Sequence, residues 1–379
     1  MDIPIINVKE NNAALAEEIL AAVSRVIRHG QYILGPSVES FEAAVADRLG
    51  VGHVVAVNSG TDALWLTLKA LAIGPGDEVI TTPNTFVATV AAIHHAGAIP
   101  CLVDVGDDEN LDPVALADAV GPRTRAVIAV HLRGRPARMR EIAAIAERNG
   151  LVVIEDASQA FGATLDGVPA GRLARAGCFS LHPQKILGAC GDAGMVTTDD
   201  GELAASLRLL RNHGLMTRDS VATWGFNSRL DPLQAEILRM KLRHIDATIA
   251  RHRRVAARYH AALAGLPLRL PREAPAEHCV YYHYSIMSDR RDALREFLRG
   301  RGIDASVHYP TPIHRQPAAR GILIGRGGVA NCERQACEQL SLPIYAHLTD
   351  IDVLTIVNAV RAFHREPALE ALPLTERIQ

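Results

Sequence analysis

Short apolar runs alternate with helical segments from about residue 50 to residue 200. Runs of four or five apolar residues predict strands, whereas apolar residues three and four positions apart predict helices. Strands that alternate with helices are typical of βαβ units, so an α/β fold with a mainly parallel sheet is expected. The expected strands are 53–57, 78–81, 126–130, 151–155, 177–180 and 195–198, and two of the expected helices are 61–71 and 136–149.

The pattern changes in the last third of the chain. Residues 231–264 are expected to form one long amphipathic helix, rich in arginine, that leads into a second domain. Beyond about residue 280 a small α+β unit is expected. Its elements are a strand near 281–287, a helix near 291–299 and a last helix near 350–363. We therefore expect a large domain over residues 1–245 and a smaller one over residues 246–379.

Composition indicates an ordinary globular enzyme, with 48% hydrophobic and 22% charged residues. The formal net charge of −2 gives no basic face for nucleic acid and no polybasic membrane segment. No apolar stretch reaches the roughly 18 residues of a membrane span, and the first residues lack a signal-peptide pattern, so a cytoplasmic location is expected. The six cysteines form no CxxC pair, so no metal site is expected.

Lysine is rare: only four occur among the 40 basic Lys and Arg residues. An imine requires an amine that can lose its proton, which a guanidinium cannot do. Lys9, Lys69 and Lys241 lie in the N-terminal segment or on amphipathic helices, where a solvated charge is expected. Lys185 instead lies in a loop bounded by Pro183 and Gly188. By itself, this lysine could equally be a surface residue.

The segment 58–62 (NSGTD) follows an apolar strand and begins a helix. The free N–H groups and the dipole of a helix N-terminus favour phosphate binding. The alternative is ordinary helix capping by Ser59, Thr61 or Asp62.

Asp156 follows a wholly apolar strand, and the carboxyl ends of parallel strands line the ligand crevice of such sheets. A carboxylate there can pair with a protonated ring nitrogen, as pyridoxal phosphate (PLP) requires. Gln159 could reach the ring hydroxyl from the same side. The alternative is a helix-capping aspartate. A carboxylate, a phosphate-binding turn and an isolated loop lysine together fit PLP, with Lys185 forming the Schiff base.

These segments resemble the sugar aminotransferases of the DegT/DnrJ/EryC1/StrS family, within the fold-type I PLP enzymes. The resemblance covers nearly the whole chain. The matching segments include GQYILGPSVESFE (30–42), VNSGTDAL (57–64), GPGDEVITTPNTFVAT (74–89), VIEDASQAFGA (153–163), GDAGMVTTDD (191–200), RNHG (211–214), GFNSRLDPLQA (225–235), VHYPTPIH (307–314) and LSLPIYAHLTD (340–350).

The resemblance implies a role for each matching residue in turn. Gly60, Thr61 and Ser180 correspond to phosphate ligands, Phe86 to the aromatic residue on the pyridine ring, Asp156 to the acid at the ring nitrogen, Gln159 to the partner of the ring hydroxyl and Lys185 to the Schiff-base lysine. His182 lies beside the cofactor in the motif, and Asn227 corresponds to an asparagine that reaches the phosphate of the neighbouring subunit's cofactor. His308 and Tyr309 match a segment near the sugar substrate, with packed loop residues as the alternative.

The chain departs from the family pattern at two positions. The family commonly has His-Leu-Tyr-Gly where this chain has Arg133 in the third place, and often has Asn where this chain has Ile186. Both departures concern the substrate more than the cofactor. A branch of the family has histidine in place of the lysine and carries out dehydration, so Lys185 favours transamination.

The resemblance implies a seven-stranded, mainly parallel sheet flanked by helices, a smaller C-terminal α+β domain and a homodimer with shared active sites. The expected reaction moves an amino group from L-glutamate or L-glutamine to a nucleotide-linked 3- or 4-keto-6-deoxyhexose. The GDAG segment (191–194) resembles 3-aminotransferases more than 4-aminotransferases. Two alternatives are a PLP-dependent sugar dehydratase and a non-catalytic regulator that senses PLP or a sugar.

Overall fold

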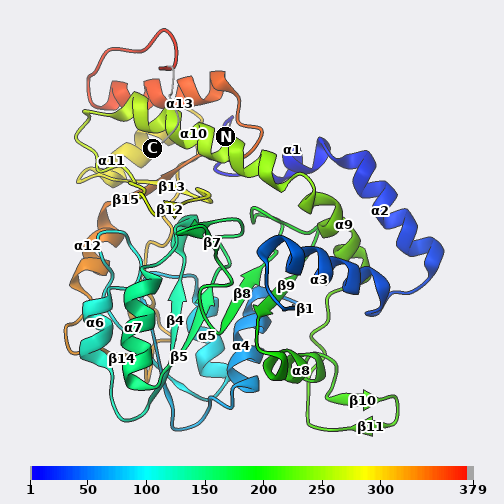
Figure 1. Cartoon of the computed structure of the whole chain (residues 1–379). Coiled ribbons are helices and arrows are strands. Elements are labelled where there is room, and N and C mark those ends of the chain that lie inside the picture. Colours follow the sequence, from blue (N-terminus) through cyan, green and yellow to red (C-terminus); the bar gives the residue numbers. More distant parts are fainter. Residues whose placement is uncertain (1, 374–379) are drawn as a thin grey trace.

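The computed structural model describes residues 2–373, which contain an eight-stranded sheet. The sheet lies below the C-terminal helices in Figure 1. Across the sheet the strands are β1 (His53–Val57), β9 (Gly194–Thr198), β8 (Ala176–Ser180), β5 (Val152–Asp156), β4 (Thr124–Val130), β2 (Glu78–Thr81), β3 (Ile99–Leu102) and β14 (Leu323–Ile324). Strand β9 runs antiparallel to both neighbours, and the remaining pairs are parallel. The expected mainly parallel sheet is confirmed, and the short edge strand β14 makes eight strands where seven were expected.

Helices cover both faces of the sheet because residues of each strand alternate between the two sides. In β4, Ile128 packs toward α4 (Gly60–Ala70), α5 (Val87–His95) and α8 (Gly201–Leu210). Its neighbour Val127 packs on the opposite side. The helices on that opposite side are α3 (Pro36–Leu49), α6 (Pro113–Ala119), α7 (Met139–Asn149) and α9 (Pro232–Leu242).

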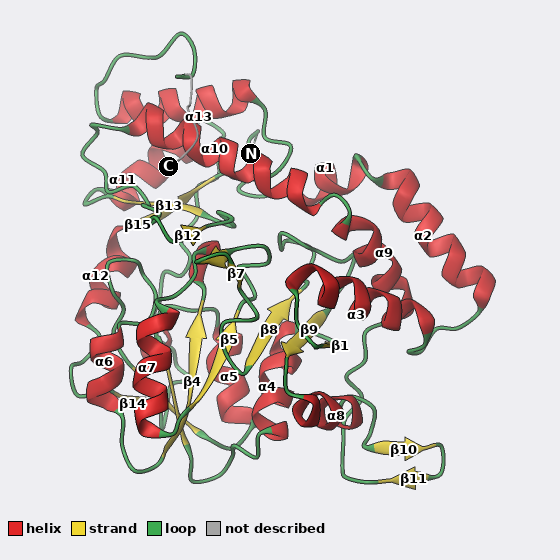
Figure 2. Cartoon of the chain, viewed as in Figure 1, coloured by secondary structure: helices red, strands yellow, loops and turns green. Residues whose placement is uncertain are grey.

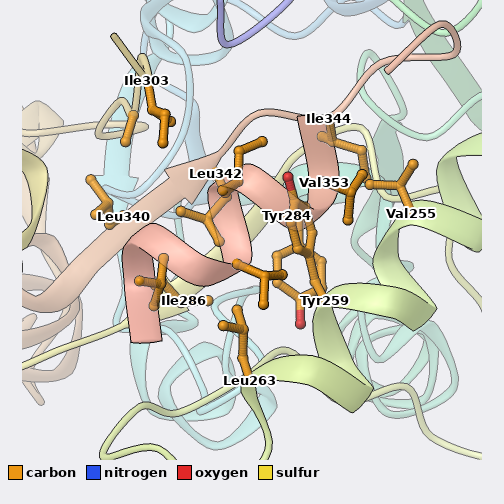
Figure 3. Close-up of a cluster of buried hydrophobic side chains, with 14 of the residues drawn as sticks. Val255, Tyr259, Leu263, Tyr284, Ile286, Ile303, Leu340, Leu342, Ile344 and Val353 are labelled. Atoms are coloured by element: carbon orange, nitrogen blue, oxygen red, sulfur yellow. The ribbon is translucent and has the colours of Figure 1, made fainter. Parts of the chain in front are cut away.

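A separate hydrophobic core lies in the C-terminal part, above the sheet in Figure 1. Its elements are α10 (Ile245–Leu263), β13 (Tyr284–Met287), α11 (Arg291–Arg299), β15 (Gln339–Leu342) and α13 (Asp350–Phe363). Helix α12 (Ala330–Glu338) contributes no residue to this core, and its Cys332 packs with Val105 instead. Tyr259 and Tyr284 are fully buried at its centre (Figure 3), and the hydroxyl of Tyr259 donates a 2.8 Å hydrogen bond to the carbonyl oxygen of Pro343. The core also includes Ile3, and β14 joins the large sheet, so the division of the chain near residue 245 stays a prediction.

The prediction of one long helix over residues 231–264 was wrong. The helix is interrupted at Arg243 and His244, which separate α9 from α10. Helix α9 packs against α3 and against α2 (Ala16–His29), whereas α10 packs against α13 in the second core. The two halves therefore face different partners, and one straight helix could not reach both.

The remaining elements are short (Figure 2). They are α1 (Val8–Ala13), η1 (Leu132–Gly134), β6 (Thr164–Leu165), β7 (Val168–Pro169), β10 (Leu215–Thr217), β11 (Ser220–Val221), β12 (Glu277–His278) and η2 (Ile313–Arg315). Over residues 2–373, none of the helices has the length and apolar character that crossing a membrane requires.

Candidate active site

The carboxyl ends of β1, β5 and β8 meet at one edge of the sheet, and α4 begins there. A Cβ atom built on Gly60, the first residue of α4, would lie 2.6 Å from the Cβ atom of Ser180. Glycine is therefore required for α4 to begin this close to the end of β8. The first N–H groups of a helix have no partner within the helix, so Gly60, Thr61 and Ser180 together form a suitable cradle for a phosphate.

Asp156 ends β5 with its carboxylate buried. One carboxylate oxygen, Oδ2, accepts a 2.7 Å hydrogen bond from the hydroxyl of Thr89, and Oδ1 accepts one of 3.2 Å from the backbone N–H of Ser158. Among residues 2–373 no basic side chain forms an ion pair with it. A buried carboxylate usually has a positively charged partner, so Asp156 is well suited to bind a protonated ring nitrogen.

Lys185 lies in the loop after β8, where its backbone N–H donates a 2.8 Å hydrogen bond to the carbonyl oxygen of His182. Its Nζ atom lies 4.7 Å from the centre of the Tyr282 ring. Burial lowers the pKa of Lys185 to about 8, and the charge of Asp156 acts in the opposite direction. This amine is therefore deprotonated far more readily than an ordinary lysine, as imine formation requires.

Gln159 and Tyr309 are in contact although they are 150 positions apart. The amide Nε2 of Gln159 donates a 3.3 Å hydrogen bond to the Tyr309 hydroxyl, and the Tyr309 ring centre lies 5.9 Å from that of Phe86. The side chain of Phe86 is 52% exposed. The structure thus brings together the residues predicted at the ring hydroxyl, at the ring face and near the sugar.

His308 stacks on His283, with ring centres 4.0 Å apart and planes 10° apart. Its Nδ1 atom also lies 3.0 Å from the hydroxyl oxygen of Ser341. Burial lowers the pKa of His308 to about 4 and that of His283 well below its usual value. Both imidazoles are neutral at physiological pH, so they can exchange hydrogen bonds with a substrate but add no positive charge.

The structure does not bring His182 and Asn227 into the buried group, because both are exposed. The Nδ1 atom of His182 accepts a 3.3 Å hydrogen bond from the backbone N–H of Gln184 in the same loop. Next to Asn227, the hydroxyl of Ser228 donates a 2.6 Å hydrogen bond to Asp62 in the first turn of α4. The predicted roles of His182 and Asn227 stay predictions.

Sequence reasoning missed the contribution of Lys241. Its Nζ atom donates hydrogen bonds of 2.6 Å to Oδ1 of Asn12 and of 2.8 Å to the carbonyl oxygen of Gly188. Lys241 therefore ties the loop of Lys185 to the N-terminal segment, and its interpretation as a solvated charge was wrong. The scarcity of lysine was the available signal. Thr89 and Tyr282 were also missed, since neither carries a charge.

A profile of the DegT/DnrJ/EryC1/StrS aminotransferase family matches residues 13–361. The chain belongs to this family. One relative, from Streptomyces venezuelae, is named dTDP-3-amino-3,4,6-trideoxy-alpha-D-glucose transaminase; it is 44% identical over 361 residues, which are 95% of each chain. Another, from Geobacillus stearothermophilus, is named a pleiotropic regulatory protein; it is 40% identical over 96% of this chain and 99% of its own.

A solved structure gives the same fold. The crystal structure of DesV from S. venezuelae in complex with a ketimine intermediate has a TM-score of 0.93 and 42% identity, and covers 97% of this chain and 99% of that one. The expectations of family, fold class and an aminotransferase acting on sugars are confirmed.

Proposed function

We propose that this member of the family is a PLP-dependent enzyme that moves an amino group from L-glutamate or L-glutamine to a nucleotide-linked keto-sugar. One observation carries the proposal. At the same edge of the sheet lie an amine with a lowered pKa, that of Lys185, and the buried carboxylate of Asp156, which forms no ion pair with a basic side chain of residues 2–373. The phosphate cradle of Gly60 and Ser180 completes a set that fits PLP.

When bound, the cofactor would serve as an electron sink that stabilises the negative charge left on the substrate carbon as a bond to this carbon breaks. The chain's own residues would hold the cofactor ring in its protonated form and move the proton of the substrate. Asp156 keeps the ring nitrogen protonated, and its hydrogen bonds from Thr89 and Ser158 fix its orientation. The amine of Lys185 accepts a proton from the substrate and returns it, because a pKa near 8 suits both steps around neutral pH.

The sugar would bind beside Tyr309 and His308, which reach the site from the C-terminal part. Neutral imidazole and phenol groups suit the hydroxyls of a sugar better than the phosphates of a nucleotide. The S. venezuelae relative is named for a 3-amino sugar linked to dTDP. That name and the GDAG segment support a 3-keto-6-deoxyhexose over the 4-keto isomer.

A homodimer with shared sites is part of the proposal, as is a cytoplasmic location. The single chain leaves large apolar side chains exposed, including Phe86, Val87 and Trp224. Exposed apolar groups of this size commonly mark an interface between subunits. A second subunit would cover Phe86 and close the cofactor site.

Two alternatives remain to be tested against this function. A dehydratase is disfavoured by Lys185, as the sequence already indicated. The G. stearothermophilus relative is named a regulatory protein, whereas the name of the S. venezuelae relative favours the transaminase. A regulator would bind PLP or a sugar without turning over.

The test is an assay of the PLP-loaded protein with glutamate or glutamine and a panel of keto-sugars linked to dTDP or UDP. We expect amino-sugar product by mass and loss of the visible cofactor band on addition of the donor alone. Release of water without amino transfer would indicate the dehydratase. Tight sugar binding with neither product would indicate the regulator.

A further inference from the structure

Arg133 is buried in the turn η1, between the end of β4 and the C-terminal part. Its guanidinium contacts the carboxylate of Glu109 and the amide oxygen of Gln339, and donates a 3.1 Å hydrogen bond to the carbonyl oxygen of His308. Its backbone N–H donates a 2.6 Å hydrogen bond to Oε1 of Gln159. One residue thus binds both the predicted cofactor side and the predicted sugar side of the site.

These contacts belong to a closed network of hydrogen bonds. The amide Nε2 of Gln339 donates a 3.0 Å hydrogen bond to the carbonyl oxygen of Tyr309. The hydroxyl of Tyr309 accepts the hydrogen bond from Gln159, which itself accepts from the backbone of Arg133. Arg133, Gln339, Tyr309 and Gln159 therefore hold one another in place across the two parts of the chain.

We propose that Arg133 is a positioning residue that determines sugar binding by fixing the segment 308–309 against Gln159. The proposal rests on the proposed function and extends it. The side chain of Arg133 is only 7% exposed, so it acts through the residues that it holds. Its planar guanidinium has five N–H donors in fixed directions, and can contact Glu109, Gln339 and His308 at once.

Glu109 supplies the negative charge that a buried guanidinium needs. The two residues must therefore be changed together, because removal of one leaves the other charge buried and unpaired. Arg133 also stands where the family commonly has tyrosine. This chain would thus fix segment 308–309 by a charged guanidinium instead of a neutral side chain.

The experiment compares Arg133→Lys with the double variant Arg133→Met/Glu109→Gln, which removes both charges and keeps the side-chain volumes similar. Loss of hydrogen bonds from a charged donor typically weakens binding by about 10- to 100-fold. We expect the double variant to raise the KM for the keto-sugar by that factor. Lysine keeps the pair with Glu109 but has no fork of donors for Gln339 and His308, so its KM should lie in between.

The control is Arg135→Met/Glu277→Gln. Arg135 lies two residues further along the same loop and forms a two-bond ion pair with Glu277 at 2.9 and 3.1 Å. Within residues 2–373 neither side chain is hydrogen-bonded to segment 308–309. This control should leave the KM for the keto-sugar unchanged. In all variants the visible cofactor band and the half-reaction with the amino donor should match the parent, because the backbone N–H that holds Gln159 is retained.

Calorimetric binding of the nucleotide-linked amino sugar gives a readout independent of turnover, and thermal unfolding shows that each variant is folded. An unchanged sugar affinity in the folded Arg133→Met/Glu109→Gln variant would overturn the proposal. So would an equal slowing of both half-reactions, which would indicate a general structural role. If the parent binds the sugar but transfers no amino group, the proposed function fails while the affinity comparison still decides the role of Arg133.

Discussion

The hydroxyl of Thr89 and the carboxylate of Asp156 are joined by a 2.7 Å hydrogen bond inside the protein. Thr89 also lies 2.8 Å, oxygen to oxygen, from the hydroxyl of Thr85. Both threonines come from the segment around the start of α5, whereas Asp156 ends β5. The orientation of this carboxylate thus depends on two threonines from a different element of the fold.

We expect Asp156→Asn to retain PLP but to lower turnover by at least about 100-fold. Without the carboxylate the ring nitrogen is less readily protonated, and the protonated ring is needed to stabilise negative charge only on the reaction path. Thr89→Val should lower turnover by about 10-fold, the typical effect of one hydrogen bond to a charged group. Steady-state kinetics with measured PLP content checks both. A near-parental rate in Asp156→Asn would make this residue a mere cap.

Borohydride reduction of the PLP-loaded protein should abolish the visible band and leave a pyridoxyl group on Lys185. Lys241→Arg is the matched control, since burial also lowers the pKa of Lys241. This control should still be labelled at Lys185, whereas Lys185→Arg should take no label because a guanidinium supplies no free amine. Peptide mapping identifies the site. A label on Lys9, Lys69 or Lys241 would contradict the assignment.

The capture of PLP by the cofactor-free protein should depend on pH. Burial lowers the pKa of Lys185 to about 8, so the reactive neutral amine increases as the pH rises and is the main form above pH 8. We expect the capture rate to rise from pH 6.5 and to level off near pH 8, by stopped-flow absorbance. A rate that still rose tenfold per pH unit at pH 9 would indicate a lysine with its ordinary pKa of about 10.5.

Asn227→Asp should weaken PLP binding, because a carboxylate would face the dianionic phosphate. Co-expression of this variant with the inactive Lys185→Ala tests the shared site. If Asn227 reaches the partner's cofactor, each mixed dimer has one site with both defects and one with neither. Random pairing makes half the dimers mixed, so about a quarter of all sites should be active.

The opposite outcome is equally clear. Mixed dimers confirmed by mass but without activity would place Asn227 in the site of its own subunit. The hydrogen bond from Ser228 to Asp62 of the same chain makes this a real alternative. Each variant expressed alone provides the baseline.

Much of the fold was predictable from local pattern. Strands 53–57 and 78–81 and helices 291–299 and 350–363 were predicted with the observed bounds, because their apolar residues are continuous or regularly spaced. Strand β3 (Ile99–Leu102) was not predicted; it is short and contains Pro100, which removes a backbone donor. The break between α9 and α10 has no proline or glycine to mark it, so packing against different partners decides it.

The candidate site was predictable where a residue type has a distinctive chemistry, as for Lys185 and Asp156. The network around Arg133 was not. Its members lie at positions 109, 133, 159, 309 and 339, and only the tertiary fold brings them together. Arginine in that loop was visible as a departure from the family pattern, but its buried partners were not.

Strand β14 adds residues 323–324 to the edge of a sheet whose other strands end at residue 198, and Ile3 packs in the core formed by residues 255–360. During synthesis on the ribosome, the edge of the large sheet at β3 therefore stays unpaired until residues 323–324 have emerged. Ile3 is likewise without its packing partners until residues 255–360 have been made. Exposed strand edges of this kind promote aggregation. Completion of the sheet thus depends on residues 323–324, which are synthesised long after its other strands.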